Sequence, residues 1–300
     1  MPGKSNLISL VQLGIVDYAT GLRVQQQLVA LRKEEKIGDV LLLLEHAPVI
    51  TLGRNAKAAN VIASPELLAQ RGVELFECDR GGDVTFHGPG QIVGYPIFDL
   101  RGYARGAADA SSALKKTLGA VEFVRRLEEV LIRTCADFAI PTKRVPGLTG
   151  VWTNNSSLSF RVEENDSQNR SLESRNLLSA RAATNSSPEA KLAAIGVHIS
   201  RFVTSHGFAL NVNNDLSYFN LIIPCGITAK PVTSMQQELG KPLELTAVAE
   251  SISRNFGTVF SSQMLWVDTL DALLGRAVGV PLLPPVKLRR FHEEDEATWA

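Results

Sequence analysis

Residues 80–100, RGGDVTFHGPGQIVGYPIFDL, constrain the fold of this chain more than any other stretch of it. The first half gathers four glycines and a proline around an Arg, an Asp, a Thr and a His, and these are Gly81, Gly82, Gly88, Pro89 and Gly90. Glycine adopts positive φ easily and lets a ligand approach the main chain. The stretch therefore predicts a loop moulded around a ligand, followed by a buried strand over 92–98.

Two familiar phosphate-binding loops do not fit this stretch. A Walker loop needs Lys and then Ser or Thr after its last glycine, whereas Gly90 is followed by Gln91 and Ile92. A dinucleotide loop needs GxGxxG, whereas Gly88, Gly90 and Gly94 are spaced one residue too long. The glycines therefore predict neither kind of nucleotide site.

The stretch resembles the signature of the lipoyl(octanoyl) transferases, which are acyltransferases of lipoate biosynthesis. The resemblance is gap-free over Arg80-Gly81-Gly82, Thr85, His87-Gly88-Pro89-Gly90-Gln91 and Tyr95. Two further family motifs follow in the expected order. Lys191 precedes Ala193-Ala194-Ile195-Gly196, and Cys225 stands within Pro224-Cys225-Gly226-Ile227. The resemblance implies that Lys191 and Cys225 are the catalytic residues.

The order of predicted elements indicates a mixed α/β fold. We expect strands over 8–13, 40–45, 73–78, 92–98, 147–153, 191–197 and 208–212, and helices from Asp17, from Ser64, over 107–138 and over 246–260. Residues 51–55 and the charges at Lys143 and Arg144 are expected in loops. The resemblance sharpens the fold class to a central mixed sheet flanked by helices, similar to the catalytic domain of biotin and lipoate protein ligases.

A single catalytic domain over 1–275 is expected, with a peripheral tail over 276–300. Residues 154–190 interrupt it, because fifteen of them are Ser or Asn and few are apolar. Such a segment buries too little apolar surface to offset an ordering cost of about 1–2 kcal/mol per residue, so a disordered insertion is predicted.

Composition excludes several classes of function. Lys+Arg and Asp+Glu are both 31, so no bulk affinity for nucleic acid or anionic membranes is indicated. The apolar runs are far shorter than the ~20 residues that cross a bilayer, so a soluble protein is expected. The three cysteines and five histidines lack metal-ligand spacing, so neither a disulfide framework nor a metal site is predicted. Cys135 lies on a helical apolar stripe and Cys78 in a predicted strand, so both thiols are expected to be buried in the core rather than catalytic.

The physics of a Cys–Lys pair agrees with the implied roles. A thiol with a pKa near 8.5 is only a few per cent thiolate at neutral pH. Lowering that pKa by about 1.5 units needs roughly 2 kcal/mol. An ammonium about 4 Å away supplies on the order of 4 kcal/mol at an effective dielectric of 20, before desolvation. Lys191 is therefore sufficient to activate Cys225, while His87 stays open as either a partner of the thiol or a structural hydrogen-bond donor.

The resemblance implies a ping-pong reaction without cofactor or metal. Cys225 takes octanoyl from octanoyl-acyl carrier protein, and a lysine of a lipoyl domain removes it, in 2-oxoacid dehydrogenase complexes or the glycine cleavage H protein. The implied substrate contacts are Arg80, Gly81, Gly82, Asp83, Val84, Thr85, Phe86, His87, Ala194, Ile195, Gly196, Gly207, Phe208 and Ala209. Local positive charge for acidic carrier proteins is expected at Arg101, Arg105, Lys143 and Arg144.

Three alternatives remain open at this point. The chain is compatible with an ATP-dependent lipoate or biotin ligase of the same fold, with a non-catalytic module that binds acyl groups or lipoyl domains, and with a Cys–His hydrolase. The insertion over 154–190 is more typical of a eukaryotic chain, so a mitochondrial location is expected, with the cytoplasm as the alternative. The N-terminal sequence itself carries no clear targeting signal.

Overall fold

The computed structural model describes residues 6–103, 117–154, 189–224 and 230–275. Its centre is an eight-stranded mixed sheet in the order β11-β1-β2-β6-β10-β9-β8-β7. The strands are β1 (Asn6–Val16), β2 (Asp39–His46), β6 (Gln91–Ile97), β7 (Thr142–Val145), β8 (Leu148–Thr153), β9 (Lys191–Ser200), β10 (Val203–Asn211) and β11 (Ser262–Trp266). β1 runs parallel to β2 and β11, whereas the other pairs are antiparallel. The predicted mixed sheet is confirmed.

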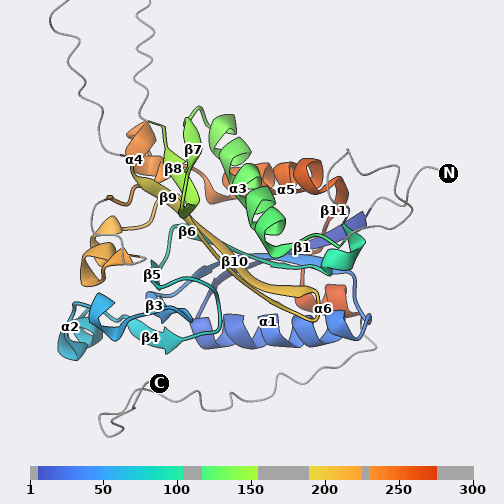
Figure 1. The fold of residues 1–300 in the computed structure, drawn as a ribbon, viewed down its shortest axis with the longest axis horizontal. Coiled ribbons are helices and arrows are strands. Elements are labelled where there is room, and N and C mark those ends of the chain that lie inside the picture. Colours follow the sequence, from blue (N-terminus) through green and yellow to red (C-terminus); the bar gives the residue numbers. More distant parts are fainter. Residues whose placement is uncertain (1–5, 104–116, 155–188, 225–229, 276–300) are drawn as a thin grey trace, which may run out of the picture.

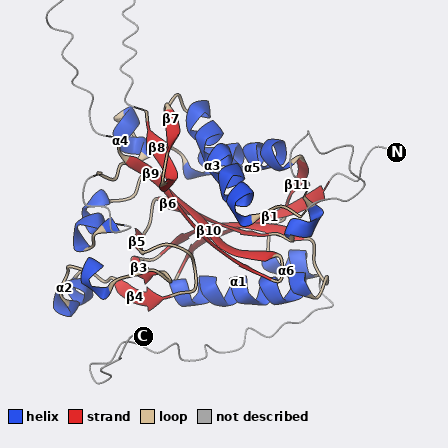
Figure 2. Ribbon diagram, viewed as in Figure 1, coloured by secondary structure: helices blue, strands red, loops and turns tan. Residues whose placement is uncertain are grey.

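Helices cover both faces of this sheet (Figures 1 and 2). α1 (Tyr18–Lys33) lies along one face, and α3 (Ala120–Asp137) and α5 (Leu245–Phe260) lie together on the other. The short helices α2 (Pro65–Gln70), α4 (Met235–Leu239) and α6 (Leu270–Leu274) lie at the periphery. The sheet is thus the middle layer of three, which explains the continuous apolar run in β2.

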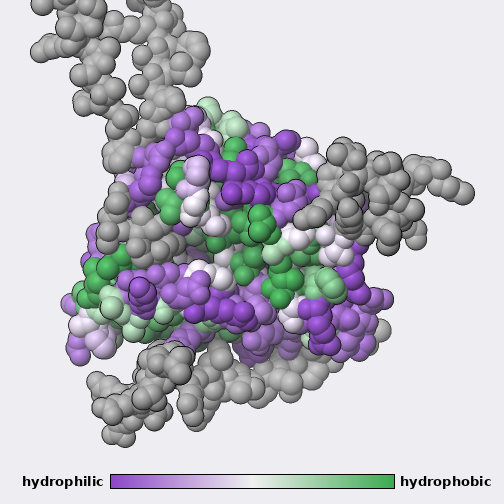
Figure 3. Space-filling view, viewed as in Figure 1, coloured by the Kyte–Doolittle hydropathy of each residue, from purple (hydrophilic) through white to green (hydrophobic). Residues whose placement is uncertain are grey.

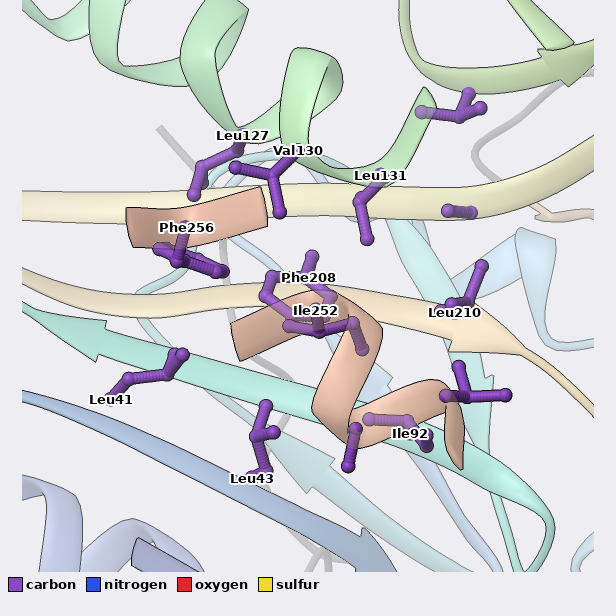
Figure 4. Packing of buried hydrophobic residues seen from close by; sticks show 14 of the residues in the cluster. Leu41, Leu43, Ile92, Leu127, Val130, Leu131, Phe208, Leu210, Ile252 and Phe256 are labelled. Atoms are coloured by element: carbon purple, nitrogen blue, oxygen red, sulfur yellow. The ribbon is translucent and has the colours of Figure 1, made fainter. Parts of the chain in front are cut away.

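The main core lies between the sheet and the pair α3 and α5 (Figure 4). Leu127 and Leu131 point from α3 toward the sheet, and Phe208 and Leu210 of β10 rise to meet them. Phe256 of α5 packs among them and is fully buried. Burying each such side chain contributes roughly 1.5–3 kcal/mol, so this layer fixes the position of the β9–β10 hairpin.

A second sheet of three short strands, in the order β4-β3-β5, packs beside the main one. It consists of β3 (Val49–Leu52), β4 (Glu74–Glu77) and β5 (Val84–His87). Two predictions are corrected here. Thr51 belongs to a strand rather than to a loop, and the glycine-rich stretch is not one loop, because its residues 84–87 form β5. Their spacing allows Val84 and Phe86 to enter an apolar cluster while Thr85 and His87 face the opposite way.

Local sequence signals explain where most helices begin. Asp17 caps α1 by accepting a hydrogen bond from the Thr20 amide, and Ser64 caps α2 in the same way from Leu67, as predicted. The helix predicted over 107–138 is wrong in its start, since α3 begins at Ala120 after Gly119. Residues 104–116 lie outside the described part of the chain. Lys143 and Arg144 lie on the edge strand β7 rather than in a loop.

Apolar residues gather across the middle of one face of the molecule, between polar margins above and below (Figure 3). The predicted disordered insertion falls almost entirely on 155–188, and the predicted tail on 276–300, and both lie outside the described residues. Among the residues that the structure describes, no helix is long and apolar enough to span a membrane.

Candidate active site

The β9–β10 hairpin forms the floor of the candidate site. Ala194 lies opposite Ala209 in its register, and Gly196 lies opposite Gly207. Lys191 is the first residue of β9, and its main chain is fixed by a 2.8 Å hydrogen bond to the carbonyl of Pro231. Small residues along this floor leave room above the sheet, as the resemblance implied.

The side chain of Lys191 is almost buried, with 8% of its surface exposed. Its Nζ lies 5.2 Å from the centroid of the Trp152 ring, and the Nζ of Lys230 lies 5.5 Å from the same ring. A cation over an indole face is attracted by the ring quadrupole. Gly150 lies beside the lysine stem, and a methyl group there would come within 2.9 Å of the Lys191 Cε. Strand β8 thus directs the Lys191 ammonium.

Cys225 itself lies outside the described residues, together with 226–229. The preceding residue, Pro224, is described, and it lines a cavity of about 280 Å³ together with Lys191. Pro224, the residue before the predicted nucleophile, therefore lies in the wall of the cavity that also holds the predicted activator. Their catalytic roles stay predictions.

A larger cavity, of about 500 Å³, adjoins the first. The two share Thr85, Ala194 and Ala209 as lining residues, and these form the neck between them. Twelve of the fourteen predicted substrate contacts line the larger cavity, and these are Arg80, Gly81, Gly82, Asp83, Thr85, His87, Ala194, Ile195, Gly196, Gly207, Phe208 and Ala209. Val84 and Phe86 do not line it, because strand alternation turns them into the apolar cluster of the second sheet.

The loop before β5 roofs the larger cavity by close backbone contact. Gly81 donates a 3.1 Å hydrogen bond to the carbonyl of Val197 on β9. A methyl group on Gly196 would lie 2.5 Å from the Gly81 carbonyl oxygen. Gly82 has φ +94, which favours glycine. The glycines of the motif therefore allow the loop before β5 to pack closely against β9.

A buried polar chain runs from this roof to the floor. The guanidinium of Arg80 donates to Thr51, with Nε 3.2 Å and Nη2 2.9 Å from Oγ1. Thr51 lies 3.4 Å from Nε2 of His87, and Nδ1 of His87 lies 2.8 Å from Oε1 of Gln91. Gln91 then donates to Oδ1 of Asn211 at 2.8 Å. Because the Gln91 amide nitrogen already donates, its oxygen accepts, so His87 carries its proton on Nδ1.

The electrostatics of His87 bear on its two predicted roles. Burial lowers its pKa to about 3, with smaller contributions from the neighbouring His46 and Arg80. A neutral imidazole whose proton is committed to Gln91 is a poor general base at neutral pH. In this geometry His87 connects Thr51 to Gln91, and its role stays a prediction.

His46 and Tyr95 form a second buried pair beside the cavity. The phenol of Tyr95 donates a 2.6 Å hydrogen bond to Nε2 of His46, whose Nδ1 donates to the carbonyl of Val16 at 3.1 Å. Burial lowers the pKa of His46 to about 4 and raises that of Tyr95. His46 is therefore a neutral anchor for the tyrosine.

Four cavity-lining residues escaped the sequence prediction of substrate contacts: Tyr18, Val93, Tyr95 and His206. His206 has φ +55, and its Nε2 lies 2.6 Å from Asp79 Oδ1. This bond, with the nearby His198, lowers the pKa of Asp79 to about 2. In the sequence, the one indication that His206 lines the cavity is its neighbour Gly207, which was predicted as a substrate contact.

The basic residues predicted to attract acidic partners already have intramolecular partners. Arg101 pairs with Asp99 at 2.5 Å, Arg144 with Glu129 at 2.8 Å and Lys143 with Glu189 at 2.5 Å. Arg105 lies outside the described residues. The pairs on Glu189, which also include Lys230, lower the pKa of that carboxyl to about 2.

Sequence comparison gives the family of the chain. A family model described as the lipoyl protein ligase A/B catalytic domain matches residues 17–257. The chain is similar to the octanoyltransferase of Koribacter versatilis, with 55% identity over 289 residues, which are 96% of this chain and 98% of that protein. It is also similar to the octanoyltransferase of Acidobacterium capsulatum, with 50% identity over 270 residues, covering 89% and 96% of the two chains.

Solved structures of low sequence identity share the fold. A bi-partite lipoate protein ligase from Thermoplasma acidophilum superposes with a TM-score of 0.60 at 11% identity, covering 91% of both chains. A lipoate-protein ligase A bound with ATP gives 0.58 at 11%, covering 91% and 93%. The two octanoyltransferase relatives are bacterial, so the expected mitochondrial location is not supported. The predicted family is confirmed, and the chain belongs to the lipoyl protein ligase A/B catalytic-domain family.

Proposed function

We propose that this protein is an octanoyltransferase, which moves octanoyl from acyl carrier protein to a lysine of a lipoyl domain through a thioester on Cys225. The observation that carries the proposal is the pair of joined cavities. Lys191 and Pro224, the residue before Cys225, line one of them. The other lies above small residues of β9 and β10 and suits an alkyl chain. The octanoyltransferases at 55% and 50% identity support the same activity.

In the first half-reaction, the acyl chain enters the larger cavity through the neck. The Lys191 ammonium favours the thiolate of Cys225, and this thiolate attacks the thioester carbonyl of the donor. The bond between carbonyl carbon and donor sulfur breaks, and the donor thiolate leaves and takes up the proton of Lys191, which becomes a neutral amine. The product is octanoyl-Cys225, with free acyl carrier protein released.

In the second half-reaction, the lysine of the lipoyl domain replaces the carrier. Lys191, now a neutral amine, removes a proton from the incoming ammonium, because an ammonium has no lone pair with which to attack. The resulting amine attacks the thioester on Cys225 and the carbon–sulfur bond breaks. An amide forms, Cys225 leaves as the thiolate beside the Lys191 ammonium, and the remaining proton of the attacking nitrogen passes to solvent. Thioester to amide is downhill, so the reaction needs no ATP.

The polar chain behind the cavity supports this mechanism over a Cys–His hydrolase. His87 is buried, neutral and bonded to Gln91, so it does not suit the activation of a thiol. We assign Arg80, Thr51 and His87 to holding the roof of the cavity in place.

The proposal extends to partners, domain and location. Lipoyl domains of 2-oxoacid dehydrogenase complexes and of the glycine cleavage H protein are the proposed acceptors. Residues 1–275 are proposed as one catalytic domain, since the eight-stranded sheet has helices on both faces and the three-stranded sheet packs beside it. The bacterial relatives favour the cytoplasm as the place of reaction.

Intact-protein mass spectrometry tests the intermediate. Incubation with octanoyl-acyl carrier protein is expected to add one octanoyl group, located on Cys225 by peptide mapping and absent in Cys225→Ala. An adduct on Cys78 or Cys135 instead would contradict the mechanism. Pyrophosphate released from ATP and free octanoate would identify the ligase alternative, and the absence of acyl transfer to a lipoyl domain would identify a binding module.

The role of Lys191 is tested separately by thiol alkylation. Lys191→Ala is expected to raise the pKa of the Cys225 thiol, so alkylation at neutral pH slows and its pH profile moves to higher pH. Lys230→Ala is the matched control, because it removes the other ammonium from the Trp152 ring. An unchanged profile in Lys191→Ala would show that Lys191 is not the activator.

A further inference from the structure

Three rings line the larger cavity apart from its neck. Tyr18, Tyr95 and His206 line it, and none of them lines the smaller cavity that holds Lys191. The rings of Tyr95 and His206 meet edge to face, with centroids 6.3 Å apart. The three side chains are nearly buried, with at most 5% of their surface exposed. We call them the ring wall.

The spacing between the neck and the ring wall matches one acyl chain length. Ala209 stands at the neck and His206 at the wall, three residues apart on β10, which corresponds to roughly 10 Å along a strand. Three bonds of an extended chain span about 3.3–3.6 Å, so the seven carbon–carbon bonds of octanoyl span about 8 Å. A chain of ten carbons adds about 2 Å and meets the wall.

Each member of the ring wall is fixed by its neighbours. The Tyr95 phenol is bonded to His46 at 2.6 Å. His206 is bonded to Asp79 through its ring and to Gln25 through its amide, at 2.6 and 2.5 Å. The Tyr18 ring packs against the rings of His46 and Phe76, with centroids 5.1 and 5.2 Å apart. Side chains locked in this way present a hard stop rather than an adaptable surface.

We infer that Tyr18, Tyr95 and His206 set the acyl chain length, by stopping the methyl end of an eight-carbon chain and excluding longer ones. This inference rests on the proposed acyl transfer and names the specificity-determining residues of the same cavity. A pocket closed by packed rings rejects an additional methylene by a factor of about 10–200. Two extra methylenes therefore suffice for strong selection.

Two variants open the wall by independent routes. His206→Gly removes a ring at a position whose φ of +55 glycine adopts without strain. Tyr18→Leu removes a ring from the first turn of α1 and keeps an apolar side chain there. The controls are Arg201→Gly, at φ +50 in the exposed turn before β10, and Tyr103→Leu, a buried tyrosine in the core on the α3 and α5 side of the sheet.

The experiment is a competition between octanoyl- and decanoyl-acyl carrier protein at equal concentration, read as the two acyl masses on the intact enzyme. The wild type and both controls are expected to carry octanoyl in large excess. The ratio of decanoyl to octanoyl is expected to rise at least tenfold in His206→Gly and in Tyr18→Leu. Thermal melting shows which variants are folded, and one folded wall variant is enough to decide.

The outcomes separate this inference from the proposed function. A ratio within twofold of the wild-type value in a folded wall variant overturns the ring wall as the determinant. An equal rise in the control variants attributes the change to general loosening and overturns it as well. If the wild type takes neither acyl group while it is folded, the proposed function fails, and the ring wall as a chain-length determinant fails with it.

Discussion

Lys191 owes the direction of its side chain to a glycine on the adjacent strand. Gly150 has φ +127, and its amide donates a 3.1 Å hydrogen bond to the buried carboxylate of Glu128. A methyl group at Gly150 would lie 2.5 Å from the Ala193 carbonyl oxygen and 2.9 Å from the Lys191 Cε. One residue without a side chain thus makes room for the predicted activator.

Gly150→Ala is expected to lower kcat/KM for octanoyl transfer about 100-fold, since a displacement of about 1 Å at a reacting group costs that much. Backbone strain adds about 1–3 kcal/mol of lost stability. Gly147→Ala is the matched control, because Gly147 has φ +78 but no atom within 4 Å of the added methyl. Steady-state kinetics and urea unfolding of both variants separate the two effects. Equal losses of activity in both variants would refute the steric argument.

At the residue scale, the motif residues of the site could be predicted from the sequence, but the residues from other elements that line the same cavity could not. Arg80, Thr85, His87 and Lys191 stand in contiguous patterns, so they were predictable. Tyr18 comes from a helix more than sixty residues before the motif, and only the packing of α1 on the sheet brings it to the cavity. Contacts of this kind depend on sheet order and register, which no local pattern records.

At the scale of elements, the second sheet is joined to the first by the polar chain from Arg80 to Asn211. Arg80 is 9% exposed, and its guanidinium is satisfied by Thr51 and by main-chain carbonyl oxygens rather than by a carboxylate in the described part of the chain. A buried cation without enough acceptors is costly. The hydroxyl of Thr51 therefore holds the roof loop to β3.

Thr51→Val is expected to lower the free energy of unfolding by about 2–3 kcal/mol, because it removes two acceptor contacts from a buried charge at nearly constant volume. Thr134→Val is the control, since the hydroxyl of that buried threonine accepts a 3.4 Å bond from the neutral amide of Asn255. Urea unfolding at pH 7 measures both. Equal losses would show that the charge of Arg80 is irrelevant to the effect.

The misassigned elements share a cause. β5 has four residues between glycine-rich turns, and β7 has four residues with two charges, so neither gives a clear alternating pattern. Long elements such as α5 and β2 were predicted closely, because their periodicity runs over many residues. Such short segments form strands because they pair with a neighbouring strand, as β7 pairs with β8.

At the scale of the whole molecule, two buried histidines link stability to pH. The folded pKa values of His46 and His87, about 4 and about 3, lie below the ordinary value of 6.5 because burial penalises the charged form. The unfolded chain therefore binds more protons between pH 6.5 and 4. The stabilisation is complete above pH 6.5 and is lost as the pH falls below that value.

The free energy of unfolding is expected to fall by up to about 1.4 kcal/mol per pH unit for each histidine between pH 6 and 5. His87→Gln removes one titrating group, so its curve in this window is expected to have about half the slope, even though the variant is less stable overall. Urea unfolding at three pH values measures the slopes. Since ordinary carboxyl groups titrate mostly below pH 5, identical slopes would rule out His87.

Trp152 gives the enzyme an internal optical signal. It is 1% exposed and has the ammonium groups of Lys191 and Lys230 near one ring. The emission of an indole responds to the electric field across it, so any change in the charge or position of Lys191 changes the fluorescence of Trp152. The chain has three tryptophans, and replacing Trp266 and Trp299 by phenylalanine leaves Trp152 as the sole emitter. The proton movements proposed for Lys191 can thereby be followed without a label.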